Sequence, residues 1–341
     1  MALFKKDPLQ IIVFQTYGTG SHLYIKGRAL EDESIDLEQK GMLDLLINSW
    51  KRFETDEIKN TPLNIKLPNN KIFQVVSSER GYFLLNEPFG DIADLTNEEG
   101  WLQFEASYDD PNIKRNIQNG NRFPGEMLIP SKDCSYGVIS DIDDTILHTG
   151  LVSTFKWRVI YNTMLKRPSK RTPLKGAPEF YHLLHRGKSG KEKNPIFYVS
   201  HSPWNLYRYL EYFLKKNNFP KGPILLRDFP NPFSKNSKSE KPQKQKEILN
   251  ILKSYPDMKF ILIGDSGEHD PDIYIEIAES HPDRILAIYL RSVNHEERML
   301  RVKGLIEDYK TTDVLMVEDS ESAIAHALEK GFISLPKNNR K

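Results

Sequence analysis

Short apolar runs alternate with amphipathic helical patterns throughout the second part of the chain, and this alternation constrains the fold more than any other feature. Each run is four to six residues long. Continuous apolar strands are buried on both faces, so the pattern predicts a parallel sheet covered by helices on both sides. We expect strands at 136–140, 195–199, 223–226, 259–263, 285–290 and 313–317. We expect helices at 203–217, 243–254, 271–280 and 320–330.

The first part of the chain has a different rhythm, with short apolar or alternating runs between turns rich in Asn, Gly and Pro. This spacing is typical of a β-sandwich. The expected strands are 11–16, 22–28, 63–67, 72–76, 81–85, 101–107 and 126–129, and apolar residues at helical spacing predict one helix at 36–52. We therefore divide the chain into an N-terminal β-sandwich-like domain (1–133), an α/β domain with a Rossmann-like parallel sheet (134–335) and a polar tail (336–341).

The composition excludes several classes of protein. With 341 residues and 38% hydrophobic residues, the chain can bury two cores without disulfide bonds. No apolar run approaches the roughly 18 residues that a membrane-spanning helix needs. Charged residues interrupt the apolar N-terminus, so we expect no signal peptide, and a single cysteine, Cys134, excludes a disulfide framework. We expect a cytoplasmic protein.

The two predicted domains differ in charge. Residues 1–133 contain 15 basic and 21 acidic residues, a net charge of −6, whereas the remainder contains 33 and 26, a net charge of +7. A mildly basic second domain suits an anionic ligand. An ordinary solvated surface explains the same numbers, so charge alone leaves both interpretations open.

Acidic residues gather where the first strand of the predicted parallel sheet ends. Asp141, Asp143 and Asp144 follow the apolar run 136–140. In an extended segment, Asp141 and Asp143 would point the same way. Like charges destabilise one another when they are buried, and a divalent cation would offset that cost. Asp144 is better explained as a local cap or turn residue.

Further polar residues follow other predicted strands. Ser200 comes directly after 195–199, and Asp265 and Asp270 follow 259–263. Lys244 and Lys246 open the predicted helix at 243–254. In open parallel sheets, ligands bind beyond the carboxyl ends of the strands, so we expect these side chains to line one site.

These motifs, taken in order, resemble the haloacid dehalogenase superfamily of phosphotransferases. The superfamily pattern is DxDx[TV], a Ser or Thr after a strand, a Lys, and an acidic GD motif. Here the pattern is matched by Asp141-x-Asp143-x-Thr145, then Ser200, Lys244 and Gly264-Asp265. The order of four motifs at strand ends is much more specific than DxDxT alone.

A narrower resemblance covers most of the chain. Segments 139–146, 197–207, 222–228 and 260–278 look like the catalytic domain of the actin-patch-type phosphatidate phosphatases, and segments 22–30 and 52–58 resemble the N-terminal domain of bacterial relatives of that family. The resemblance implies Mg²⁺-dependent removal of a phosphate group, with phosphatidate as the substrate class.

The resemblance also implies roles for individual residues. Asp141 would be the nucleophile that forms an aspartyl-phosphate, and Asp143 the general acid and base. Ser200 and Lys244 would hold the phosphate oxygens. Mg²⁺ would be bound by Asp141, the backbone carbonyl of Asp143, and Asp265. Asp270 would bind the metal or cap the following helix. Family spacing favours Lys244 over Lys246 as the phosphate-binding lysine.

A long insertion between Asp141 and Ser200 predicts a small helical cap over the site. It contains a run of aromatic and apolar residues followed by Lys166, Arg167, Lys170 and Arg171. Such a segment could contact a lipid phosphate and a membrane surface, or it could be a lid with a solvated basic loop. We expect an anionic phosphate-monoester substrate and no nucleic-acid partner. The alternatives are a phosphatase of a soluble phosphometabolite or phosphoprotein, and a non-catalytic binding protein.

Overall fold

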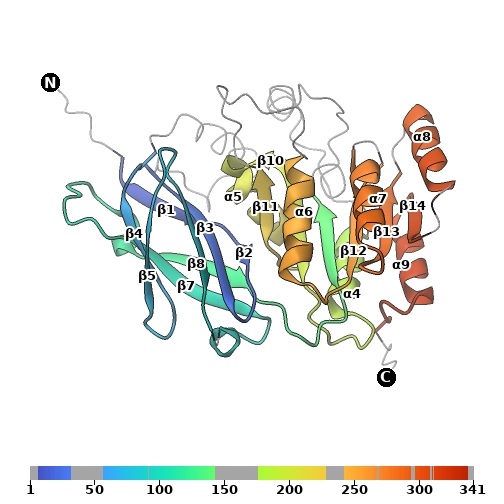
Figure 1. Cartoon of the computed structure of the whole chain (residues 1–341), viewed down its shortest axis with the longest axis horizontal. Coiled ribbons are helices and arrows are strands. Elements are labelled where there is room, and N and C mark those ends of the chain that lie inside the picture. The colour runs from blue at the N-terminus through green and yellow to red at the C-terminus, as the bar shows by residue number, and fades with distance from the viewer. Residues whose placement is uncertain are drawn as a thin grey trace. The chain divides into compact units, whose positions relative to one another are not determined.

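The chain folds into two compact units, one comprising residues 1–130 with 205–209 and the other residues 131–204 with 210–341 (Figure 1). The computed structural model describes residues 7–31, 57–90, 92–142, 176–227, 242–266, 269–292, 296–307, 309 and 311–336. The helix predicted at 36–52 lies outside the described residues, and so do residues 143–175, which include the basic segment of the insertion.

The first unit contains two β-sheets. One is antiparallel, in the order β1 (Leu9–Val13), β3 (His22–Glu31) and β6 (Tyr82–Pro88). The other has the order β2 (Thr16–Tyr17), β8 (Phe123–Leu128), β7 (Trp101–Tyr108), β4 (Pro62–Lys66) and β5 (Ile72–Val76). Short 3₁₀ helices lie at Ala93–Leu95 and Gln118–Asn121. Each of the seven strands predicted in this region overlaps an observed one, whereas the two-residue β2 is too short to leave a pattern.

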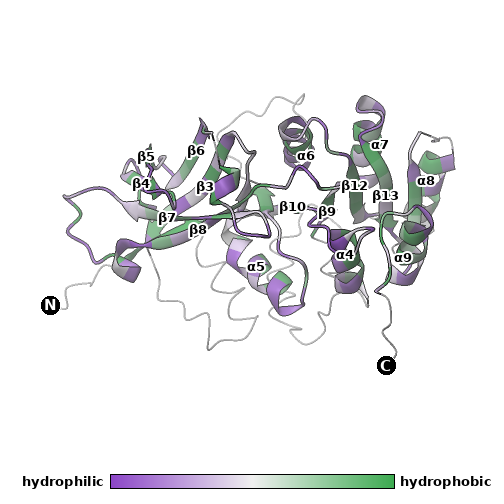
Figure 2. Cartoon of the chain, turned by 90° about the horizontal axis from the view of Figure 1, so that it is seen from below, coloured by the Kyte–Doolittle hydropathy of each residue, from purple (hydrophilic) through white to green (hydrophobic). Residues whose placement is uncertain are grey.

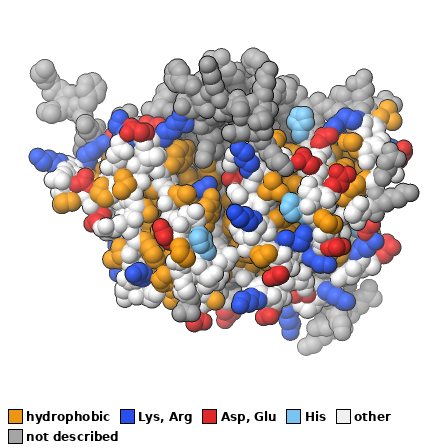
Figure 3. All heavy atoms as spheres, viewed as in Figure 1, with side chains coloured by type: hydrophobic (Ala, Val, Ile, Leu, Met, Phe, Trp, Pro, Cys, Tyr) orange, Lys and Arg blue, Asp and Glu red, His pale blue; other side chains and the backbone are white. Residues whose placement is uncertain are grey.

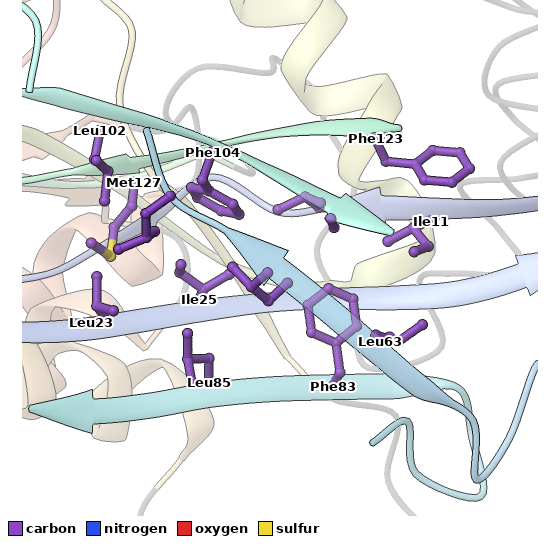
Figure 4. Close-up of a cluster of buried hydrophobic side chains, with 14 of the residues drawn as sticks. Ile11, Leu23, Ile25, Leu63, Phe83, Leu85, Leu102, Phe104, Phe123 and Met127 are labelled. Atoms are coloured by element: carbon purple, nitrogen blue, oxygen red, sulfur yellow. The ribbon is translucent and has the colours of Figure 1, made fainter. Parts of the chain in front are cut away.

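Both sheets of the first unit contribute to one hydrophobic core. Figure 4 shows Leu23 and Ile25 of β3 and Phe83 of β6 facing Phe104 of β7 and Met127 of β8, and all five are buried. Burying a large apolar side chain stabilises a fold by about 1.5–3 kcal/mol relative to leaving it exposed. The alternating burial along β3 therefore accounts for the position of this sheet: its inward residues join the core and its outward ones are partly exposed.

The second unit is built around a six-stranded parallel sheet, as the sequence predicts. Its order is β11 (Ile224–Arg227), β10 (Ile196–Pro203), β9 (Gly137–Asp141), β12 (Phe260–Asp265), β13 (Ile285–Arg291) and β14 (Asp313–Val317). Every strand pairs in parallel with its neighbours. The four inner strands are almost wholly buried, which explains their continuous apolar sequences.

Helices cover both faces of this sheet. They are α4 (Ala177–Arg186), α5 (Tyr207–Lys216), α6 (Gln243–Ser254), α7 (Asp270–Ser280), α8 (Glu296–Glu307) and α9 (Ser320–Glu329). In Figure 2, α6 and α7 lie on one side of the strands, with α4 and α9 on the other. The predicted helix 203–217 begins later than expected, because β10 extends to Pro203 and a 3₁₀ turn, Trp204–Leu206, precedes α5. The sequence pattern did not indicate α4 or α8.

The strand order reverses direction at β9. From β9 the chain adds β10 and β11 on one side, and then returns to add β12, β13 and β14 on the other. Asp141 is level with Val199 of β10, and Ser140 is level with Ile263 of β12. The carboxyl ends of β10, β9 and β12 therefore meet at one edge, which is the usual ligand position in sheets of this topology.

Candidate active site

Three of the predicted site residues lie together at the carboxyl edge of the parallel sheet. Asp141 is the last residue of β9, Asp265 is the last residue of β12, and Ser200 lies in β10 one position beyond the residue paired with Asp141. Each is at most 2% exposed. The register of the strands thus places two carboxylates and a hydroxyl on neighbouring strands. Asp143 lies outside the described residues, and its role stays a prediction.

Lys244 reaches this edge from the first turn of α6. Its Nζ donates a hydrogen bond to Asp141 Oδ1 at 2.8 Å and a second one to Asp270 Oδ1. Burial alone would lower the pKa of Lys244, but the carboxylates of Asp141 and Asp270 outweigh burial and hold that pKa well above its ordinary value. Lys244 is therefore a permanent cation in the working pH range. Lys246 lies on another part of the helix surface and is half-buried.

Asp270, the first residue of α7, connects the lysine to the end of β12. Its Oδ1 accepts from Lys244, and its Oδ2 accepts from the backbone N–H of Asp265 at 3.1 Å. Gly264 makes this contact possible, because a Cβ there would lie 2.5 Å from Asp270 Oδ2 and 2.7 Å from Tyr274 Cε2. In this structure Asp270 thus positions Lys244 and the end of β12. Whether it also binds a metal stays a prediction.

The charges of these buried groups do not cancel. The three carboxylates of Asp141, Asp265 and Asp270 face one ammonium, that of Lys244, which leaves two negative charges when all are ionised. Carboxylate oxygens are the donors that Mg²⁺ prefers, so the chemistry of this donor set fits a divalent cation. Among the described residues, no group of three or more His, Cys, Asp or Glu side chains converges closely enough to form a complete metal site.

A hydrogen-bonded chain behind Asp141 was not visible in the sequence. Ser140 Oγ lies 2.9 Å from the carbonyl oxygen of Asp141 and 2.6 Å from the hydroxyl of Tyr181 in α4. A carbonyl oxygen only accepts, so Ser140 gives its single proton to Asp141 and Tyr181 donates to Ser140. Burial raises the pKa of Tyr181, which keeps this donor protonated. These two hydrogen bonds fix the backbone at Asp141. The sequence did not predict α4, so it could not place Tyr181 beside Ser140.

Ser200 is held in place from its own strand. Its Oγ accepts a hydrogen bond from the backbone N–H of Ser202 at 2.8 Å, and both residues are buried. A serine hydroxyl can accept one hydrogen bond and donate another, so Ser200 has the chemistry to donate to an oxygen atom of a ligand.

The comparison with protein families points to one class of catalytic domain. Residues 136–292, which include the parallel strands β9 to β13, match the family described as "Phosphatidate phosphatase APP1, catalytic domain". This match supports the narrower resemblance found in the sequence. Placement in the larger haloacid dehalogenase superfamily, and a bacterial type, stay predictions.

Two curated relatives extend the similarity beyond that segment. Phosphatidate phosphatase APP1 of Saccharomyces cerevisiae is 32% identical over 277 residues, which cover 77% of this chain and 45% of the yeast protein. An uncharacterized protein of Schizosaccharomyces pombe is 27% identical over 266 residues, covering 77% of this chain and 40% of that protein. The chain thus spans less than half the length of each relative. The solved structure of EndoBT-3987 from Bacteroides thetaiotamicron, at 8% identity and a TM-score of 0.22 over 74% of this chain and 71% of that one, is too different to carry an argument.

The described helices and the described surface bear on whether the chain contacts a membrane. No helix in the described ranges is both long and apolar enough to cross a bilayer. On the face seen in Figure 3, basic and acidic side chains of the described residues are interspersed. The predicted basic segment of the insertion is outside the described residues, so its contact with a membrane stays a prediction.

Proposed function

We propose that this chain is a phosphoric monoester hydrolase whose substrate is phosphatidate or a related anionic lipid phosphate. The observation that carries the proposal is the buried Asp141 carboxylate, held by Lys244 where the strand order reverses. A carboxylate is ionised at neutral pH and can act as a nucleophile without a base to activate it. The similarity of residues 136–292 to a phosphatidate phosphatase catalytic domain supports this chemistry and suggests the substrate class.

The proposed reaction has two steps. In the first, an oxygen of Asp141 attacks phosphorus, the bond from phosphorus to the ester oxygen breaks, and Asp143 protonates the departing alcohol. In the second, Asp143 takes a proton from a water molecule, which attacks the aspartyl-phosphate and releases inorganic phosphate. Lys244 compensates negative charge throughout, and the hydroxyl of Ser200 donates a hydrogen bond to a phosphate oxygen.

A Mg²⁺ ion fits the acidic edge of the sheet. Asp141, Asp265 and the backbone carbonyl of Asp143 would hold it, and the bound ion would neutralise charge between the nucleophile and the phosphate. Asp270 is the candidate for a further contact through water. Its oxygens already accept from Lys244 and Asp265, so we assign it first to positioning Lys244.

The same proposal extends to the architecture. We propose that the first unit is a β-sandwich, that the second is a Rossmann-like catalytic domain, and that the insertion between Asp141 and Ser200 forms a small cap. A lipid substrate requires the protein to work at a membrane surface, so we propose a cytoplasmic protein with peripheral membrane contact.

The test compares Asp141→Asn with Asp133→Asn, an exposed aspartate that serves as the matched control. Turnover of phosphatidate in mixed micelles with Mg²⁺ should fall below about 1% in Asp141→Asn, because an amide is a poor nucleophile. The fold should persist, since Lys244 keeps Asp270 as its partner. The control should retain full activity. Substantial turnover in a folded Asp141→Asn protein would contradict the covalent mechanism.

The substrate is tested with a panel of phosphatidate, lysophosphatidate, sugar phosphates and phosphopeptides, each with and without Mg²⁺. We expect phosphatidate to be hydrolysed fastest and all turnover to need Mg²⁺. Faster hydrolysis of a sugar phosphate or a phosphopeptide would favour the soluble-substrate alternative. No hydrolysis of any compound would favour a binding protein.

A further inference from the structure

Gln245, the neighbour of Lys244 in the first turn of α6, has a buried amide without a visible role. The residue is 2% exposed. Within the part of the chain that the structure describes, its Nε2 is buried and has no hydrogen-bond partner. The side-chain amide can donate two hydrogen bonds, so the helix holds unused donor capacity beside the site lysine.

Such a group needs an explanation. A buried amide that has lost its bonds to water and gained none in the protein destabilises the fold, and native proteins contain few of them. A methionine or leucine of similar size would fill the same volume without this cost. A ligand that accepts a hydrogen bond from this amide would offset the cost of burying it, and would explain a glutamine at this position.

The position of Gln245 indicates the kind of ligand. The residue before α6 is Pro242, and no side chain of the described residues caps the helix. Lys246 N donates to Pro242 O at 3.1 Å and closes the first turn. The N–H groups of the first turn and the helix dipole make this end favourable for anions. Side chains lean toward the N-terminus of a helix, so the amide of Gln245 and these N–H groups serve the same region.

This end of α6 belongs to the edge of the sheet where the site lies. Lys244 reaches Asp141 from it, and α6 packs on β10, the strand that carries Ser200. We propose that Gln245 donates its amide N–H to an oxygen of the substrate's phosphate group, together with backbone N–H groups at the start of α6. The proposal rests on the proposed function and names an additional binding residue for it.

The chemistry of a neutral donor suits this place. The three carboxylates of Asp141, Asp265 and Asp270 are balanced by three positive charges, which Lys244 and a divalent cation would supply. A tetrahedral phosphate carries more oxygen atoms than those two groups can satisfy, and an amide donor binds one of them without altering the charge balance. The ligand class is a phosphate monoester dianion, or inorganic phosphate as its product.

The decisive variant is Gln245→Met, which keeps the volume and removes the donor. We expect the ligand-free protein to be at least as stable as the wild type, measured as Tm without phosphate, because an unsatisfied buried group is removed. The increase in Tm caused by millimolar inorganic phosphate should be much smaller than in the wild type. The kcat/KM for phosphatidate should fall about tenfold, the usual effect of one hydrogen bond to a charged group.

Gln243→Met is the matched control. Gln243 is in the same turn, but its Nε2 donates to Glu247 Oε1 at 3.0 Å, so the amide already has a partner. We expect this variant to lose a little stability and to keep the full response to phosphate. A purely structural Gln245 would instead give a lower Tm in Gln245→Met and an unchanged phosphate response, and that pattern would overturn the inference. So would a wild-type protein whose Tm does not respond to phosphate.

Two ligands separate the possible sources of the phosphate group. If Gln245→Met reduces the Tm increase caused by inorganic phosphate and also raises the KM for phosphatidate, the amide contacts the phosphate group itself, as proposed. If only the lipid is affected, the amide contacts another part of the lipid and the proposal is wrong. Because the Tm measurement needs no turnover, a lost phosphate response in Gln245→Met would support the inference even if the chain hydrolysed none of the panel substrates.

Discussion

The two units of the molecule bury very different residues. Among the described residues, the buried polar side chains of the first unit carry no charge: they are Gln15, Thr16, Thr61 and Ser77. The buried polar side chains of the second unit include five charged ones: Asp141, Lys244, Glu247, Asp265 and Asp270. Burying a charge costs several kcal/mol unless it is compensated. The first unit is therefore stabilised by its apolar core, whereas the second keeps costly charges at one edge, which is the usual property of a functional site.

Removing the only buried ammonium described in the second unit should break this contrast most severely. Lys244→Met would leave Asp141 and Asp270 facing each other without their cation, and we expect a loss of about 3–5 kcal/mol in the free energy of unfolding at pH 7. Urea denaturation at pH 7 measures this loss.

Lys246→Met provides the control on the same helix. Its side chain is half-buried, and we expect a loss below about 1 kcal/mol that does not depend on pH between 5 and 8. In the wild type, the raised pKa of Lys244 means that its contribution is complete below the ordinary lysine pKa and is lost only as the pH rises through the higher folded-state value. Equal losses in the two variants would mean that the Lys244 ion pairs contribute little.

Substitutions at two glycines test whether tight packing supports only stability in the first unit, but both stability and catalysis in the second. A Cβ on Gly264 would meet Asp270 Oδ2 at 2.5 Å, and one on Gly27 in β3 would meet Phe83 Cζ at 2.4 Å. We expect Gly264→Ala and Gly27→Ala each to cost about 1–3 kcal/mol of stability through overpacking. Only Gly264→Ala should also lower kcat, because it displaces the carboxylate that holds Lys244.

Gly304 in α8 shows what alanine does without a clash. Among the described residues, no atom outside the neighbouring helix backbone lies within 4 Å of a Cβ built there. Gly304→Ala should therefore raise stability by about 0.5–1 kcal/mol through better helix propensity. Urea denaturation and steady-state kinetics on all three variants complete the comparison. If Gly27→Ala lowered kcat as much as Gly264→Ala in folded protein, the close contact between Gly264 and Asp270 would have no specific role in catalysis.

An exposed carboxylate of the second unit should give the smallest effect. Asp319 caps α9 by accepting from Ser322 N at 2.9 Å and Ser322 Oγ at 2.8 Å, and these bonds lower the pKa of Asp319. A lowered carboxyl pKa gives stability that is present above the ordinary value of about 4 and is lost as the pH falls through the folded-state value. Asp319→Ala should therefore lower the Tm at pH 7 slightly, and the difference should vanish near pH 2.

Asp319→Asn is the conservative comparison. Asparagine keeps an oxygen acceptor for the helix N-terminus, so this variant should lose less than alanine. Any Tm difference between Asp319→Asn and the wild type should therefore reflect the loss of the negative charge. A Tm difference for Asp319→Ala that persisted unchanged at pH 2 would show that the ionised carboxylate is not the source of the capping effect.

The sequence was sufficient to predict the parallel sheet because its strands must be apolar on both faces. All six predicted strands of the second unit overlap observed ones, and the predicted helix 243–254 coincides with α6. By contrast, α8 combines many charges with Gly304, which weakens its periodic pattern. Helix α4 was missed because it lies within the long insertion between Asp141 and Ser200, where the pattern gives no helix boundary.

The site was predicted as a set of positions but not as a set of contacts. Parallel strand ends meet at one edge, so Asp141, Ser200 and Asp265 could be expected together from topology. The bond from Lys244 to Asp270 joins the first turns of two helices, and their approach depends on how both pack on the sheet. The burial of Gln245 follows from the same packing. The sequence around each residue does not indicate such a contact, because its partner lies far away in the chain and is brought near only by packing.

The position of β9 at the centre of its sheet has a consequence for how the chain is made. Lys244 follows Asp141 by 103 residues. At roughly 5–20 residues per second, a ribosome needs about 5–20 s to produce the cation after the anion. The neighbour β12 and Asp270 emerge later still, so no nascent chain can close this edge until residue 270 has been synthesised. Until then the hydrated carboxylate of Asp141 opposes burial of β9, and translation itself sets the order in which the site assembles.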